Sequence, residues 1–136
     1  MQKITLFFLV VIFYSSFCLA QTQTEMNQDA GKSYKQVDKK LNDVYQKIFK
    51  LYSKNTLFLK NLRTSQKIWI QFRDAQLAMK YPERSPGYYG SILPICKESY
   101  LSELTSKRVK ELEVWLGKPI EGDDCTGTVG EYVVEE

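Results

Sequence analysis

The chain of 136 residues is long enough for one small domain, and its 43% hydrophobic and 26% charged residues are typical of a globular protein. The formal net charge of +3 comes without a basic run, which argues against nucleic-acid binding. The absence of histidine excludes Ser-His and Cys-His nucleophile pairs, the HExxH zinc helix and histidine general bases, so we expect no enzyme, no cofactor and no metal site.

Residues 1–20 have the features of a secretory signal. A lysine near the start precedes an apolar run over residues 4–14, and the small residues Cys18 and Ala20 stand at the −3 and −1 positions of a cleavage site before Gln21. The apolar run is shorter than the ~20 residues of a membrane span. We therefore expect a periplasmic or secreted protein with no membrane span after cleavage; a retained anchor is the alternative.

The segment after the leader predicts one long amphipathic helix. Thr24 is a fair cap, and apolar residues then recur at steps of three and four, the spacing of one helix face. The helix is expected to span about 28 residues, roughly 42 Å. Its apolar face consists of Met26, Ala30, Tyr34, Val37, Leu41, Val44, Ile48 and Tyr52, widened by Tyr45 and Phe49.

A polar turn at residues 53–56 leads to a second predicted helix, which ends before Pro82 because proline cannot continue a helix. Residues 81–90 form an irregular loop with two prolines and two glycines. A third helix starts near Ser91 and stops at Gly117. Its expected inner face is Ile92, Ile95, Ser99, Leu101, Leu104, Arg108, Leu112 and either Trp115 or Leu116.

These elements predict an all-α fold: a three-helix antiparallel up-down-up bundle over residues 21–117. Residues 118–136 are acidic and glycine-rich, and predict a polar, mostly irregular tail with a short strand-like end at residues 132–134. The expected core includes Tyr34, Leu41, Tyr45, Trp69, Phe72, Leu104 and Leu112.

Charged and polar side chains lie on or beside the predicted apolar faces. An unpaired buried ion is very costly, so we expect Arg73 and Arg108 to be paired with acids, with amides completing the hydrogen bonds. The alternative is a ligand or catalytic site. The expected polar layer consists of Asp38, Asn42, Gln66, Arg73, Asp74, Thr105, Arg108 and Glu111.

The loop over residues 81–90 is the better functional candidate. Tyr81, Tyr88 and Tyr89, with Arg84, give it a composition enriched in protein interfaces. The alternative is that these rings pack on the end of the bundle as a lid. In the tail, Asp123 and Asp124 indicate a solvated turn rather than a metal site, and they belong to the second candidate surface for a partner.

Two cysteines, Cys96 and Cys125, remain after the signal, and an even pair in an oxidising compartment favours a disulfide. The helix from Cys96 to Leu116 rises ~30 Å, and the nine steps from Leu116 to Cys125 span at most about 31 Å. A bridge therefore requires the tail to run straight back along the third helix. Free thiols or an intermolecular bond are the alternatives.

Three segments together resemble one family. They are "MNQDAGKSYKQVDKKLNDVY", "QKIWIQFRDAQ" and "YYGSILPICKESYLSELTSKRVKELEVWL", which occur in the order found in the lysozyme inhibitor LprI-like N-terminal domain family. The resemblance covers Thr24 to Leu116. The family's usual cysteines fall on Asp29, Leu77 and Tyr100 here, so the disulfide pattern differs from that of the family.

The resemblance implies a secreted or periplasmic binding protein, and for some members inhibition of lysozyme. Cleft occlusion is the implied mechanism, with the loop over residues 81–90 entering the cleft and Arg84 facing the catalytic acids. The acidic tail, Glu121 to Glu136, is the second candidate, because many lysozymes are cationic. The alternatives are an envelope structural or interaction protein and an immunity protein against a delivered peptidoglycan hydrolase.

Overall fold

The computed structural model describes residues 2–119 and 121–132, with side chains described for Thr22 and from Thr24 onward within those ranges. Three α-helices and one short 3-10 helix make up its regular structure: α1 (Gln2–Leu51), α2 (Thr56–Lys80), α3 (Leu93–Glu113) and η1 (Val114–Leu116). No strand occurs in these two ranges. The all-α fold predicted from the sequence is confirmed.

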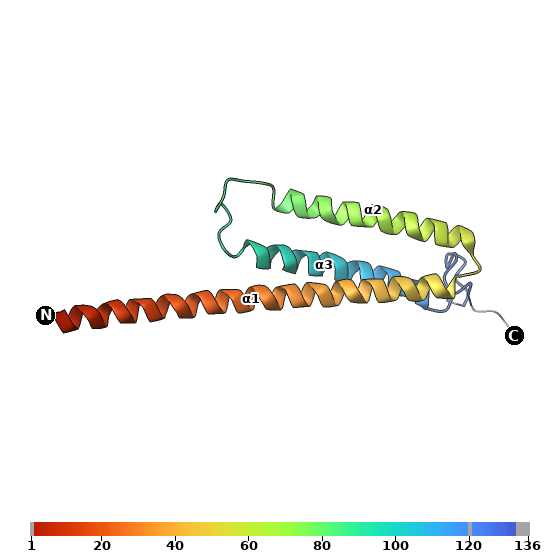
Figure 1. The fold of residues 1–136 in the computed structure, drawn as a ribbon. Coiled ribbons are helices and arrows are strands. Elements are labelled where there is room, and N and C mark those ends of the chain that lie inside the picture. Colours follow the sequence, from red (N-terminus) through yellow and green to blue (C-terminus); the bar gives the residue numbers. More distant parts are fainter. Residues whose placement is uncertain (1, 120, 133–136) are drawn as a thin grey trace.

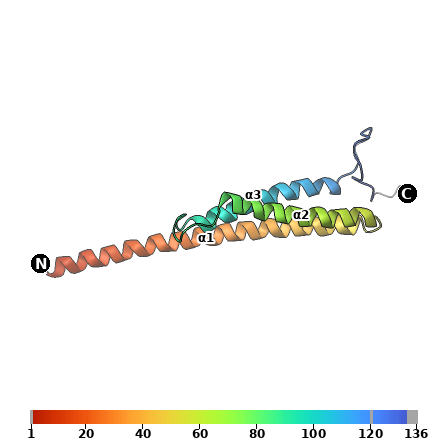
Figure 2. The same cartoon turned by 90° about the horizontal axis from the view of Figure 1, so that it is seen from above.

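The chain reverses direction twice (Figure 1). The short turn after Leu51 sends α2 back along the molecule, and the loop after Lys80 brings α3 forward again beside α1. The second view, from above, shows α3 displaced to one side of the other two helices (Figure 2). The N-terminal part of α1 runs on beyond the start of α3 (Figure 1).

α1 is longer than the sequence predicted, because it continues without a break through residues 2–23. The segment expected to be a signal, residues 1–20, lies in the projecting part of this helix, apart from residue 1, which is outside the described residues.

α1 packs tightly against α3 at Gly31, where an added Cβ would lie 3.1 Å from Glu98 Oε2. Among residues with described side chains, no helix is long and apolar enough to cross a membrane.

The residues at the two ends of α2 explain where the helix begins and ends. Asn55 caps the helix, its side-chain oxygen accepting a hydrogen bond from the Phe58 amide at 2.9 Å. At the other end the Tyr81 amide donates to the Leu77 carbonyl, and Pro82 stops the helix. The first turn of α3 holds Pro94, where its missing donor costs nothing.

The buried core lies at one end of the molecule, next to the turn between α1 and α2. Leu41 and Leu112 are buried as predicted, while Tyr45 and Trp69 are partly buried and pack against this core. Tyr34 and Leu104 are also partly buried. The buried hydrophobic residues are Leu41, Val44, Ile48, Tyr52, Leu59, Leu62, Val109 and Leu112.

Phe72 was expected in the core, and this prediction was wrong. Its side chain is 53% exposed. The inner face of α2 runs through Leu62, Trp69 and Arg73, and Phe72 lies one residue, or about 100°, before Arg73 on the helical wheel. That rotation turns the ring from the core toward solvent.

The inner face of α3 is also rotated relative to the expected one. Thr105, Val109 and Leu112 are buried, whereas Arg108 lies on the flank toward α2. Glu98 and Ser102 continue this inner face, and each has a buried side-chain oxygen. Short side chains at Ser102 and Thr105 leave room for α1 and α3 to lie close together.

The tail is irregular, as predicted, but part of it packs on the end of the helices. The Tyr132 hydroxyl donates to the Leu116 carbonyl oxygen at 2.7 Å, and Asn55 donates to Glu131 Oε2 at 2.9 Å. Tyr132 lies in a turn rather than a strand, and residues 133–134 of the expected strand-like end are outside the described residues.

The expected Cys96–Cys125 disulfide is absent, and both thiols are free. Cys96 lies in the first turn of α3, while the tail that carries Cys125 turns back on itself at the far end of that helix (Figure 1). The bridge needed an extended tail running along α3. Successive turns between Asp123 and Tyr132 hold the tail at the helix end instead.

Candidate functional site

Tyrosine rings join the loop between α2 and α3 to the helices. Tyr81, at the end of α2, packs edge-on against Tyr100 of α3 with ring centroids 6.5 Å apart. Tyr89 packs against Tyr81 at 5.9 Å, and Tyr88 against Tyr89 at 4.9 Å. Edge-to-face packing at these distances is the favoured aromatic geometry. Residues 81–90, which we call the tyrosine loop, are therefore tied to the bundle by a row of four rings.

Backbone contacts add to the order of the tyrosine loop. The Tyr89 hydroxyl donates to the Pro82 carbonyl oxygen at 3.0 Å, which links the two sides of the loop. A turn closes where the Tyr88 amide donates to the Ser85 carbonyl oxygen at 3.1 Å. Gly87 has a φ of 82°, a left-handed conformation that glycine adopts without steric cost. The loop has a defined shape although it carries no regular secondary structure.

The four predicted loop residues divide into two pairs. Tyr81 and Tyr89 are partly buried and hold the loop on the bundle, as the lid hypothesis expected. Tyr88 is 66% exposed, and the Arg84 guanidinium lies 5.8 Å from the centre of its ring. The structure thus brings an exposed aromatic and a cation together at the loop surface, which is what the interface hypothesis expected.

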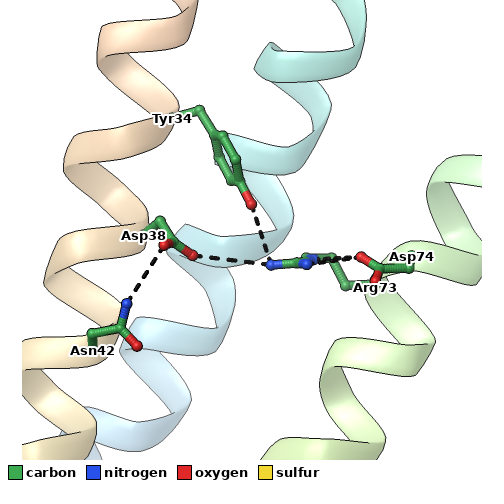
Figure 3. A network of polar contacts seen from close by, with 5 residues as sticks. All are labelled: Tyr34, Asp38, Asn42, Arg73 and Asp74. Atoms are coloured by element: carbon green, nitrogen blue, oxygen red, sulfur yellow. Dashed lines mark hydrogen bonds and ion pairs between the residues drawn. The ribbon is translucent and has the colours of Figure 1, made fainter.

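Arg73 is the centre of a polar cluster between α1 and α2 (Figure 3). Its guanidinium donates to the Tyr34 hydroxyl at 3.2 Å and pairs with Asp74 at 2.8 Å and with Asp38 at 4.0 Å. Asn42 donates to Asp38 at 3.5 Å. Burial raises the pKa of Tyr34, and the Arg73 cation opposes part of that shift. The ion pairs expected for Arg73 are present.

Arg108 forms the corresponding cluster between α3 and α2. Its three guanidinium nitrogens donate to Gln66 at 3.2 Å, to Glu111 at 3.1 Å and to Ser65 at 3.0 Å. Gln66 and Glu111 were expected partners. Sequence analysis missed Ser65, although its place one turn before Trp69 on α2 was a usable signal.

Trp69 lies between the two clusters. The Arg73 guanidinium carbon is 5.5 Å from the centre of its indole ring, and that of Arg108 is 5.9 Å away. Both are within the range of a cation–π contact. The guanidinium of each arginine is occupied by protein partners, which favours a structural role over a ligand-binding one.

Thr105 does not belong to this polar layer, so that prediction was wrong. Its side chain is 0% exposed, and its hydroxyl oxygen has no hydrogen-bond partner. The residue faces the contact between α1 and α3, whereas the layer lies toward α2. Thr105 therefore packs in the core rather than in the polar layer.

A groove of about 630 Å³ opens between α2 and α3 next to the Arg108 cluster. Its walls are mainly apolar, with polar groups at the edges, which is the usual lining of a binding groove. Sequence analysis did not predict it, because it depends on how far apart two helices lie. Its lining includes Leu57, Phe58, Leu62, Arg108, Trp115 and Glu131.

Asp123 and Asp124 lie in a local turn of the described part of the tail. Asp123 accepts a hydrogen bond from the Cys125 amide at 2.9 Å, which closes a local turn, and Asp124 is exposed. Within the described part of the chain, no group of three or more Cys, Asp or Glu side chains is placed to hold a metal. The solvated turn expected from the sequence is present.

A comparison with protein families gave a match over most of the helical part of the chain. The family described as Lysozyme inhibitor LprI matches residues 18–112, which extend from before the packed part of α1 to the last buried residue of α3. Neither the curated proteins nor the solved structures gave a match. The matched residues are well over half of the chain, which therefore belongs to the lysozyme inhibitor LprI family.

Proposed function

We propose that this protein is a secreted or periplasmic inhibitor that binds a lysozyme-type peptidoglycan hydrolase and blocks its cleft. The family supports a lysozyme-inhibitor type of binding protein. The observation that carries the proposal furthest is the ordered tyrosine loop, which presents Tyr88 and Arg84 beside each other at its surface. The protein itself performs no chemistry in this proposal, since occlusion needs only shape and charge.

The order of the loop bears directly on affinity. A flexible loop loses conformational entropy when it is immobilised in a cleft, and that loss weakens binding. Here the contacts of Tyr81 and Tyr89 hold the loop before any partner arrives. An exposed tyrosine on such a support can bury its ring without ordering the rest of the loop. Tyrosine and arginine are also the residue types that most often dominate binding energy at interfaces.

The positive charge of Arg84 suits it to a cleft that contains carboxyl groups. Lysozyme-type glycosidases use a pair of carboxyl groups in the cleft, so a guanidinium entering it meets acidic partners. In the described part of the chain, Arg84 forms no ion pair with an acid of this protein, and its recorded contact is with the Tyr88 ring. The tail acids, Asp123 and Asp124 among them, remain the second contact surface for a cationic lysozyme.

A lysis assay tests the proposal. The purified protein, as the cell processes it, is mixed with a lysozyme and cell-wall substrate, and the rate of clearing is measured. Inhibition should fall by about tenfold or more in Tyr88→Ala and Arg84→Ala, with unchanged melting temperatures, because each side chain is exposed and each loss is that of an interface anchor. Val114→Ala and Lys32→Ala, which alter exposed residues on other elements, should keep full inhibition.

Two results would count against the proposal. If the unaltered protein does not slow lysis even in large molar excess over several lysozymes, it is not an inhibitor of this class. A pull-down from periplasmic extract would then address the envelope-interaction and immunity alternatives. If lysis is slowed equally by all variants, inhibition is real but the tyrosine loop is not the contact surface.

A further inference from the structure

α2 carries a second apolar stripe that the other helices do not cover. Leu57, Ile68, Phe72 and Met79 are 67%, 58%, 53% and 71% exposed. Their spacings of eleven, four and seven residues place all four on one side of the helix. Single exposed apolar residues are ordinary, whereas several on one helix face mark an interaction surface.

A shallow groove lies next to the stripe on the surface of α2. Its volume is about 520 Å³, and it is lined by Ile68, Trp69 and Phe72. It shares Asn61 and Ser65 with the larger groove between α2 and α3. The apolar part of this surface runs from Ile68 toward Met79, since Asn61, Thr64 and Ser65 separate it from Leu57, which lines the larger groove.

Two unpaired cations, Lys60 and Lys67, lie on the flank of α2 next to this stripe, whereas Arg63 lies on nearly the opposite side of the helix. α2 contains five cations and one acid, Asp74, which is paired with Arg73. Lys60, Arg63 and Lys67 are exposed, and none of them has an acidic partner among the residues that the structure describes. Arg63 instead lies 4.6 Å from the centre of the Phe49 ring. The outer side of α2 is thus apolar along one line and positively charged along the next.

We propose that this face of α2 docks on a membrane surface rich in anionic phospholipids. An amphipathic helix with large apolar side chains on one side and lysine or arginine beside them lies flat at the headgroup boundary, with its apolar side chains among the upper acyl chains. Each cation near an anionic surface adds to the attraction. With 25 residues, α2 offers about 37 Å of such contact.

Charge distinguishes this occupant from the lysozyme of the proposed function. A cationic lysozyme would be repelled by Lys60 and Lys67, and these side chains are complementary to phosphate headgroups instead. Of the stripe residues, Met79 lies two positions before the tyrosine loop, whereas Leu57, Ile68 and Phe72 lie farther from it. Membrane docking through the part between Leu57 and Phe72 leaves the loop free to meet its partner, and the two proposals can succeed or fail independently.

Vesicle sedimentation tests the membrane proposal. The processed protein, with its N-terminal residue identified by mass spectrometry, is spun with vesicles of phosphatidylcholine alone or with about a quarter phosphatidylglycerol. We expect binding to the anionic vesicles only, and weaker binding as salt is raised. Lys60→Glu with Lys67→Glu should weaken binding by at least about tenfold, given about fivefold for each cation. Ile68→Ser with Phe72→Ser should also weaken it by about tenfold or more.

Matched variants control for charge and hydrophobicity in general. Lys47→Glu with Lys50→Glu makes the same charge change on α1, and Leu51→Ser with Val114→Ser removes two exposed apolar side chains elsewhere. Both should bind vesicles as the unaltered protein does. Since every altered residue is exposed, circular dichroism should show the same helix content in all of them.

Three results would overturn the proposal. Absence of binding to anionic vesicles removes it directly, and equal binding by the α2 variants and their controls removes the role of this face. A dimer in analytical ultracentrifugation that Ile68→Ser with Phe72→Ser abolishes would assign the stripe to a second copy. Loss of lysozyme inhibition in the same variant, with vesicle binding unchanged, would assign it to the protein partner.

Discussion

The hydroxyl of Tyr52 accepts a hydrogen bond from the Gly130 amide at 2.9 Å, across 78 positions of the chain. The same hydroxyl donates to the Trp115 carbonyl oxygen at 3.1 Å. One buried side chain at the end of α1 therefore joins the last helical turn after α3 to the tail. The tail acts as a cover for the core end of the bundle, and its stability should depend on these contacts.

Gly130→Ala should destabilise the fold more than the same change at Gly122. Both glycines have a left-handed backbone, with φ of 80° and 79°. A Cβ at Gly130 would lie 2.7 Å from the Pro119 backbone nitrogen, whereas at Gly122 it would meet nothing within 4 Å. We expect a loss of about 1–2 kcal/mol from backbone strain at either site, with a further 1–3 kcal/mol from overpacking at Gly130. Urea unfolding measures the free energy of unfolding of both variants. Equal losses in Gly130→Ala and Gly122→Ala would show that Gly130 is not packed against Pro119.

Stability should fall in alkaline solution, in part through Tyr52. Burial raises the pKa of Tyr52 above its ordinary value, and the hydrogen bond from Gly130 offsets part of that shift. A pKa raised in the folded state gives stability that is fully present below the unfolded value of about 10 and is lost as pH rises through the folded value. The free energy of unfolding should therefore decrease as pH rises above about 10.

Tyrosine-to-phenylalanine variants separate the contributions to this alkaline loss. Tyr52→Phe should be less stable at neutral pH, by about 1–3 kcal/mol, because the buried Gly130 amide loses its acceptor. Its stability should then depend less on pH above 10 than that of the unaltered protein. Burial also raises the pKa of Tyr34, so Tyr34→Phe should flatten the profile too. An unchanged profile in both variants would contradict the assignment.

Cys96 and Cys125 should both be free thiols. Cys125 is exposed, and Cys96 is partly buried in the first turn of α3. Iodoacetamide under non-reducing conditions should therefore label both residues, with Cys125 reacting first because it is more accessible. Intact mass spectrometry gives the count and peptide mapping the order. A mass without added label would indicate a disulfide that the structure does not contain.

The features that the sequence predicted best depend on local pattern. Spacings of three and four gave the inner face of α1, and Pro82 and Gly117 gave helix ends close to the observed ones. The partners of Arg73 and Arg108 were also predictable, since a charge beside an apolar face needs an opposite charge within reach. The position of Tyr88 on a loop followed from the prolines and glycines around it.

What the sequence did not predict depends on tertiary geometry. Phe72 is exposed although it was expected in the core, and Val109 is buried although it was not on the expected inner face of α3. The rotation of each helix is set by its neighbours and not by its own spacing. The groove beside Leu62 and the docking of Gly130 on Tyr52 arise from distances between segments far apart in the chain. The continuity of α1 through residues 2–23 was not predicted, because the expected signal was taken to end at Ala20.

Thr105→Val should leave stability unchanged or raise it. The Thr105 side chain is fully buried and its hydroxyl has no partner, so the folded state carries the cost of removing that hydroxyl from water. Valine has nearly the same shape without that cost, and we expect a gain of up to about 1 kcal/mol. Thr105→Ala, which leaves a small cavity, should lose about 1–2 kcal/mol. Thermal unfolding compares the two variants, and a large loss of stability in Thr105→Val would reveal a hydrogen bond made by the Thr105 hydroxyl.

Arg73→Leu should destabilise the protein by about 2 kcal/mol, measured by urea unfolding. The Arg73 side chain is only 15% exposed, and its loss leaves the partly buried Tyr34 hydroxyl without this donor and removes one cation from the Trp69 ring. Arg73→Lys keeps the charge but not the planar fork, so it should recover only part of the loss.

Arg63→Leu is the matched control on the same helix. Its guanidinium is exposed and stacks on Phe49, so its removal should cost at most about 1 kcal/mol. If Arg73→Leu is as stable as the unaltered protein, the Arg73 cluster does not hold α2 against α1. The charged residues of the Arg73 cluster would then be expected to bind a partner. Inhibition of lysozyme by Arg73→Leu would be the next measurement.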